Sequence, residues 1–186
     1  MLFRSDRLYR WLLTHRIPHE ATRWCEKTPR NIRWFGRIID YYHGDVRLIH
    51  LVRDGRDVIT SRHPYMPDRY WVSVSRWVGD VEAGLAYVDS PLVLTIRYED
   101  LIEDFRTTIA RVYAHIDEPC PSDVEAWFDR STIRTSRHWF DPLQPLHSSS
   151  IGRWRRPEHT ERVKELMEEP RAVALLRRFD YLAADA

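Results

Sequence analysis

The sequence predicts an α/β fold in which a parallel sheet is flanked by helices. Two short apolar runs rich in β-branched residues, 46–52 and 92–97, have the composition of strands that are buried on both faces. Between them, residues 71–88 carry apolar side chains at helical spacing. Because strand and helix patterns alternate, we expect both strands to lie in one layered domain that spans residues 1–186.

Other segments of the chain also carry helical patterns. Ser122 is expected to cap the helix that follows it, and Pro170 should interrupt the last helical region. Residues 131–156 lack periodicity and are predicted to form a long ordered loop, which in a compact domain is usually functional. The remaining helices are expected at residues 31–42, 57–61, 104–115, 123–128 and 157–179.

Composition restricts the classes of protein. A hydrophobic content of 43% in 186 residues is enough for one core, and a net charge of +1 argues against a nucleic-acid binder. The two cysteines, Cys25 and Cys120, lie far apart and without metal-ligand spacing, which fits a reducing compartment. No apolar run approaches the length of a membrane span, and the first residues lack a signal peptide's apolar core. We therefore expect a cytoplasmic protein with no membrane partner.

The segment 48–62 is the sharpest local feature. A strand that ends at Arg53, a turn with Gly55 and a helix together place a guanidinium beside backbone N–H groups, an arrangement that binds anions. Ser61, in the same helical region, could return a hydroxyl toward that anion. The charged residues here could instead form a solvated cluster at the sheet edge, and the residues alone leave both interpretations open.

Two motifs of the sequence are Glu-Lys-Thr-Pro-Arg-Asn at 26–31 and Val-Arg-Asp-Gly-Arg-Asp-Val at 52–58, the latter followed by Ser61. Both resemble motifs of the PAPS-dependent sulfotransferases. The closest similarity is to bacterial members and to the protein-tyrosine and heparan sulfotransferase branches. The resemblance implies that Arg53 and Ser61 bind the 3′-phosphate of the sulfuryl donor PAPS, 3′-phosphoadenosine 5′-phosphosulfate. It also implies a P-loop NTPase-like parallel sheet and a reaction that needs no metal.

The resemblance continues to about residue 183. Residues 94–101 are similar to the family's strand ending in Tyr-Glu-Asp, which would place Tyr98 by the adenine, although Tyr98 could equally close the core. Residues 150–155, Ser-Ile-Gly-Arg-Trp-Arg, resemble the late loop that folds over the nucleotide. Upstream, Arg134-Thr135-Ser136 fits the same family region. The resemblance thus assigns further nucleotide contacts to Ser136, Gly152, Arg153, Trp154 and Arg155.

The chain departs from the family at its beginning. Sulfotransferases hold the 5′-phosphosulfate in a loop rich in Gly, Ser and Thr, whereas the six glycines here are scattered and few residues precede the Glu-Lys-Thr-Pro motif. We therefore expect an N-terminally truncated domain that lacks its first strand and this loop. By itself it should transfer sulfuryl groups slowly, and an extension or a complementing chain should restore activity.

Two residues of the first motif are candidates for the transfer chemistry. Lys27 is expected to contact the bridging or sulfuryl oxygens, and Glu26 is either the general base or an ion-pair partner of an arginine. The acceptor would be a hydroxyl or amine of a small molecule, a saccharide or a peptide.

One alternative reading stays open, because the phosphosulfate loop is lacking. The chain could be an inactive, sulfotransferase-like remnant that binds adenosine 3′,5′-bisphosphate or a partner chain. A homo-oligomer or a complementing chain could cover the unpaired sheet edge. A nucleotide kinase would need a glycine-rich Walker loop, which the sequence also lacks.

Overall fold

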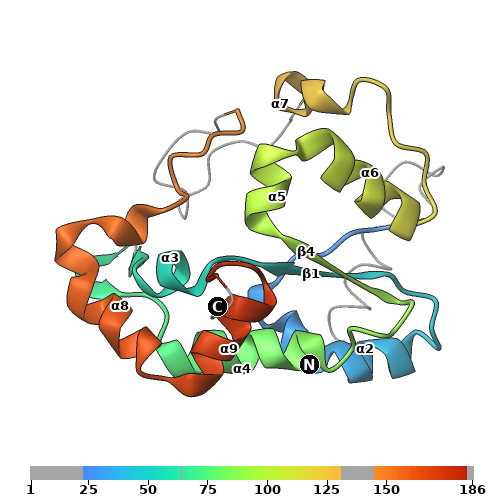
Figure 1. The fold of residues 1–186 in the computed structure, drawn as a ribbon. Coiled ribbons are helices and arrows are strands. Elements are labelled where there is room, and N and C mark those ends of the chain that lie inside the picture. Colours follow the sequence, from blue (N-terminus) through green and yellow to red (C-terminus); the bar gives the residue numbers. More distant parts are fainter. Residues whose placement is uncertain (1–22, 64, 131–144, 184–186) are drawn as a thin grey trace. The chain divides into compact units, whose positions relative to one another are not determined.

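The computed structural model describes residues 23–63, 65–130 and 145–183, shown as ribbons in Figure 1. The chain divides into two compact units, Met1–Val46 and Arg47–Ala186, and the assignment of one domain to residues 1–186 stays a prediction. In the first unit, the 3₁₀-helix η1 (Pro29–Trp34) leads into the α-helix α2 (Phe35–Tyr41). A proline suits the start of η1, since the N–H that it lacks would have no partner inside the helix.

The second unit contains the predicted parallel pair of strands. β1 (Leu48–Val52) pairs with β4 (Val93–Arg97), and His50 lies opposite Thr95. Between them come α3 (Gly55–Ile59), the antiparallel hairpin of β2 (Arg62–His63) and β3 (Met66–Tyr70), and α4 (Val74–Leu85). The sequence did not predict the hairpin, because most of its residues are exposed on both faces and show no alternation of polar and apolar residues.

The elements after β4 are all helical among the residues that the structure describes. Helix α5 (Tyr98–Glu103) was not predicted; it begins where β4 ends. The predicted cap at Ser122 is wrong, since η2 starts after Asp123 without a side-chain cap, whereas Pro170 does open a new helix. The other elements are α6 (Phe105–His115), η2 (Val124–Ala126), α7 (Trp127–Arg130), η3 (Arg153–Arg155), η4 (Pro157–His159), α8 (Thr160–Met167) and α9 (Pro170–Arg178).

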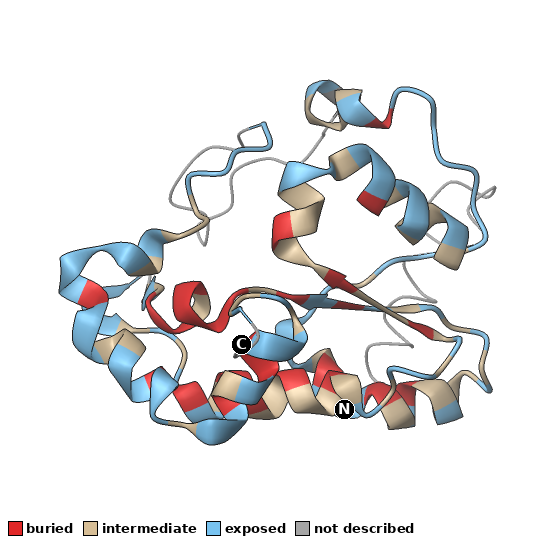
Figure 2. Cartoon of the chain, in the orientation of Figure 1, coloured by how far each residue is buried: buried red, intermediate tan, exposed pale blue. Residues whose placement is uncertain are grey.

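The core of the second unit lies on one side of the β1–β4 sheet, where α4 and α9 pack, with α6 on the other side (Figure 1). The prediction that β1 is buried on both faces is wrong in part, because Ile49 and Leu51 are 40% and 49% exposed. The alternation of red and blue along β1 in Figure 2 shows this difference between its faces. The core residues are Val52, Ile59, Val74, Trp77, Val78, Val81, Leu166, Ala172, Leu175 and Leu176.

No helix in the described ranges is long and apolar enough to cross a membrane.

A buried histidine connects β1 to α4. His50 is 5% exposed, and its Nδ1 lies 3.4 Å from the Thr95 hydroxyl. On the α4 side it lies against Gly84, where a Cβ atom would overlap the imidazole ring. Position 84 therefore requires glycine for close approach. Burial lowers the pKa of His50 to about 4, so the ring is neutral in the folded protein near pH 7.

We predict that His50 makes folding stability depend on pH. A histidine with a folded pKa of about 4 and an ordinary value of 6.5 stabilises the fold fully above pH 6.5 and progressively less as pH falls toward 4. The full effect corresponds to about 3 kcal/mol, at about 1.4 kcal/mol per pKa unit. Urea unfolding at about pH 7.5 and about pH 5 measures the larger part of this effect, about 2 kcal/mol, because the lower pH is still above the folded pKa. The His50→Asn variant should lose less stability between the two conditions, and an equal loss would contradict the prediction.

Candidate functional site

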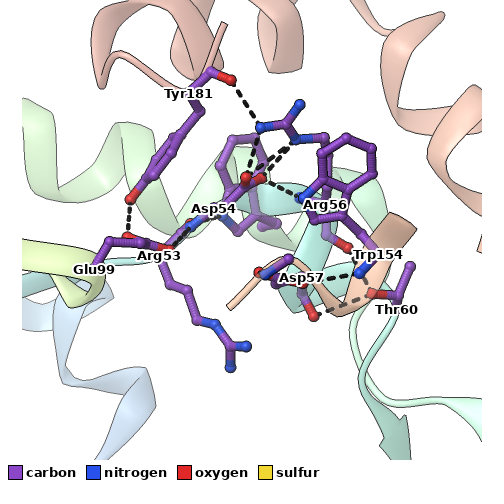
Figure 3. Close-up of polar contacts among 10 residues, drawn as sticks. Arg53, Asp54, Arg56, Asp57, Thr60, Glu99, Trp154 and Tyr181 are labelled. Carbon is purple, nitrogen blue, oxygen red and sulfur yellow. Dashed lines mark hydrogen bonds and ion pairs between the residues drawn. The ribbon is translucent and has the colours of Figure 1, made fainter. Parts of the chain in front are cut away.

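The turn after β1 contains a buried ion pair. Arg56 binds the Asp54 carboxylate through Nε and Nη2, at 2.7 Å for the shortest contact, and both residues are buried. The same carboxylate accepts the Arg56 backbone N–H at 2.9 Å and so caps α3. Arg56 also donates to the backbone oxygen of Tyr181, near the end of the chain (Figure 3). These charges are therefore structural, and the solvated cluster considered from the sequence does not form.

Glu99 joins this turn to the end of β4. One carboxylate oxygen accepts the Asp54 backbone N–H at 3.0 Å, and the other accepts the Tyr181 hydroxyl at 2.5 Å. Burial raises the pKa of Tyr181, and the hydrogen bond to Glu99 raises it further, so the phenol stays protonated. In the Tyr-Glu-Asp motif, the glutamate is thus a support for the turn.

Asp57 fixes the late loop to α3. This residue is 2% exposed, and its two carboxylate oxygens accept the backbone N–H groups of Gly152 (2.7 Å) and Trp154 (3.0 Å). Gly152 has a φ of 75°, in the left-handed region that favours glycine, and it precedes the 3₁₀ turn η3. One buried side chain thus holds two backbone groups of a loop that lies far away in sequence.

Arg53 lies on the opposite side of the turn from Arg56 (Figure 3). Its Nη2 donates to the backbone oxygen of Ser150, and its guanidinium lies 4.9 Å from the centre of the Tyr98 ring. The Tyr98 hydroxyl is 2.8 Å from the Ser150 Oγ. The Nε of Arg53 is buried and has no hydrogen-bond partner among the described residues. An arginine with an unused N–H donor and two hydroxyls therefore meet at this point.

The start of α3, where the sequence predicts an anion site, uses two of its backbone donors within the protein. The N–H groups of Asp54 and Arg56 already bind carboxylates, from Glu99 and Asp54, so these backbone donors are occupied. Ser61 follows the other end of α3, and its hydroxyl donates to the backbone oxygen of Asp57 at 2.9 Å. The cationic character of the site therefore comes from the side chain of Arg53.

The model of the sulfotransferase family matches residues 3–122, about two thirds of the chain. The chain belongs to the sulfotransferase family. No curated protein matches it in a sequence comparison. The matched residues of this sulfotransferase include Arg53, Ser61 and Tyr98, while the late loop at 150–155 lies outside the match.

The other predicted site residues of the sulfotransferase fall into three groups. In the late loop, the guanidinium groups of Arg56 and Arg155 lie 4.0 Å and 4.6 Å from the centre of the Trp154 ring. Arg153 donates to the Ser149 backbone oxygen at 3.0 Å. Ser136 lies outside the described residues.

Glu26 and Lys27 form the third group and belong to the first unit. The Glu26 oxygens accept hydrogen bonds from the Thr28 hydroxyl and the Asn31 amide, and Lys27 is exposed. This arrangement gives Glu26 a local structural role at the start of η1.

Sequence reasoning missed three residues that organise the candidate site: Asp57, Glu99 and Ser150. Asp57 and Glu99 stand within charged motifs, where a sequence gives no sign of burial. Ser150 is the last of three consecutive serines, and its position in the motif at 150–155 was the one available signal.

We predict that Asp57→Asn loosens the late loop. An amide has one oxygen that accepts and an NH₂ group that only donates, so the NH₂ group would face the N–H of Gly152 or Trp154 and leave that donor unsatisfied. Stability should fall by about 1–3 kcal/mol in urea unfolding. Amide hydrogen exchange at Gly152 and Trp154 should become faster. The exposed Asp68→Asn variant is the control, and unchanged exchange at both amides in Asp57→Asn would refute the proposed restraint.

Proposed function

We propose that this chain binds PAPS and transfers its sulfuryl group to a hydroxyl or amine of an acceptor. Membership of the sulfotransferase family supports sulfuryl transfer as the reaction class. The parallel β1–β4 pair supports a P-loop-type sheet. The proposal assigns the donor's 3′-phosphate to Arg53 and Ser61.

The unused donor of Arg53 is the observation that carries this assignment. The Nε–H of Arg53 is buried without a partner, which destabilises the folded protein until a ligand accepts its hydrogen bond. An arginine guanidinium has five N–H donors in a fork that matches phosphate. The indole N–H of Trp77 binds the Arg53 backbone oxygen at 3.3 Å and holds the residue in place. A phosphate oxygen at Arg53 would satisfy the Nε–H and neutralise the positive charge.

The neighbours of Arg53 fit the rest of the nucleotide. Tyr98 offers a ring beside the guanidinium, which suits the adenine contact that the family motif implies. The Gly152–Arg155 segment would lie over the nucleotide, and Asp57 holds its backbone next to α3. The exposed Arg153 and Arg155 add positive charge to this loop.

In the transfer step, the bond between sulfur and the bridging phosphate oxygen breaks as the acceptor's oxygen or nitrogen bonds to sulfur. Adenosine 3′,5′-bisphosphate leaves, and the acceptor's proton passes to a base. Such transfers depend mainly on alignment and on stabilising the charge of the leaving oxygens. We assign Lys27 to that charge. The hydrogen bonds of Glu26 favour its structural role over that of the base.

The assignment predicts selectivity for the 3′-phosphate. Isothermal calorimetry should show that adenosine 3′,5′-bisphosphate binds more tightly than AMP. Arg53→Ala should weaken the binding of adenosine 3′,5′-bisphosphate by about 1.5–3 kcal/mol, the scale of a hydrogen bond to a charged group, and leave AMP binding nearly unchanged.

Arg111→Ala is the matched control, since Arg111 is an exposed arginine of α6. It should bind both nucleotides as the unmodified chain does. Equal affinities for the two nucleotides in the unmodified chain would contradict the assignment of the 3′-phosphate to Arg53.

A further inference from the structure

The β2–β3 hairpin displays a group of aromatic rings, which we call the ring cluster: His63, Tyr65 and Trp71. The centres of the His63 and Trp71 rings are 4.4 Å apart, with an angle of 35° between their planes. Tyr65 lies 6.2 Å from His63. Tyr65 and Trp71 are 58% and 44% exposed, and the neighbouring Met66 is 42% exposed. Packing within the core does not account for rings that face solvent to this extent.

The base of the hairpin is anchored to α8 and η4. The Tyr70 ring lies 4.2 Å from the Arg62 guanidinium and 5.2 Å from that of Arg162. Arg162 also donates to the backbone oxygens of Val72 (2.9 Å) and Ile59 (3.4 Å). The Tyr70 hydroxyl donates to the backbone oxygen of Glu158 at 3.3 Å. These contacts fix the position of the hairpin. A surface that is already ordered loses little conformational entropy when a ligand binds to it.

The ring cluster begins next to Ser61. The Trp71 backbone N–H donates to the Ser61 backbone oxygen at 2.9 Å, which closes the base of the hairpin at that residue. His63 follows Ser61 by two positions, so their Cα atoms lie within about 7 Å of each other. The rings are thus adjacent to a residue that the proposed function assigns to the donor's 3′-phosphate.

We propose that the ring cluster binds an aromatic ring of the sulfuryl acceptor and so determines acceptor specificity, an inference that rests on the proposed function. Aromatic rings pair in offset or tilted arrangements that contribute about 0.5–1.5 kcal/mol beyond burial of their area. The adjacent side chains of Met66 and Pro67 are apolar, and thioethers also pack favourably on aromatic rings.

His63 contributes a directed hydrogen-bond donor to this subsite. Its Nδ1 accepts the Tyr65 backbone N–H at 3.2 Å, which places the proton of the neutral ring on Nε2. The Nε2–H group can donate to an acceptor oxygen. A flat ring with one hydroxyl therefore matches the cluster better than a sugar, whose several hydroxyls need several polar partners.

Binding of 2-naphthol, a fluorescent phenol, to the full chain tests the proposal in the presence of adenosine 3′,5′-bisphosphate. Trp71→Ala should weaken 2-naphthol binding about two- to twelvefold, the factor that corresponds to about 0.5–1.5 kcal/mol. Trp71→Phe should recover most of the affinity. Met167→Ala, at an exposed position of α8, should match the unmodified chain. All variants should bind adenosine 3′,5′-bisphosphate equally.

Failure of this proposal is distinguishable from failure of the proposed function. Unchanged 2-naphthol affinity in Trp71→Ala, or no binding to the unmodified chain, with nucleotide binding intact, would overturn the ring cluster as the acceptor subsite. Binding of chitotetraose instead of 2-naphthol, dependent on Trp71, would overturn the aromatic class. A tyrosine-containing peptide that binds as 2-naphthol does would support it and identify a peptide as the source of the ring. Loss of nucleotide selectivity alone would count against the proposed function.

Discussion

The buried ion pair between Asp54 and Arg56 is the contact on which the arrangement around β1 depends. Removing one partner of such a pair leaves an uncompensated buried charge and typically costs about 3–5 kcal/mol. Asp54 caps α3. Arg56 also donates to the Tyr181 backbone oxygen and packs on the Trp154 ring. Segments from three distant parts of the chain therefore meet at one turn of the second unit.

This constraint separates supporting charges from those free to bind a ligand. Four charged side chains form hydrogen bonds with other groups of the protein: Asp54, Arg56, Asp57 and Glu99. Arg53, in the same motif, retains a buried donor without a partner among the described residues. The close approach of Gly55 to the Trp77 ring, where a Cβ would lie 2.7 Å from ring atoms, leaves no room for a larger residue at the turn.

Features that depend on local sequence pattern were predicted correctly, whereas the roles of side chains that depend on burial by distant segments were missed. The strands at β1 and β4 and the break at Pro170 follow from apolar runs and from proline's missing N–H, and the structure confirms them. The roles of Asp57 and Glu99 depend on partners 95 and 45 positions away, which no local pattern encodes. The hairpin carries exposed strands, so its residues lack the alternation that would have revealed it.

The most direct test of the account is a crystal structure of the chain with adenosine 3′,5′-bisphosphate. We expect the 3′-phosphate within hydrogen-bonding distance of the Arg53 guanidinium, with the Nε–H now paired, and the Asp54–Arg56 pair unchanged. A nucleotide bound with its 3′-phosphate away from Arg53, or an Arg56 that leaves Asp54 to bind the phosphate, would contradict the division between supporting and binding charges.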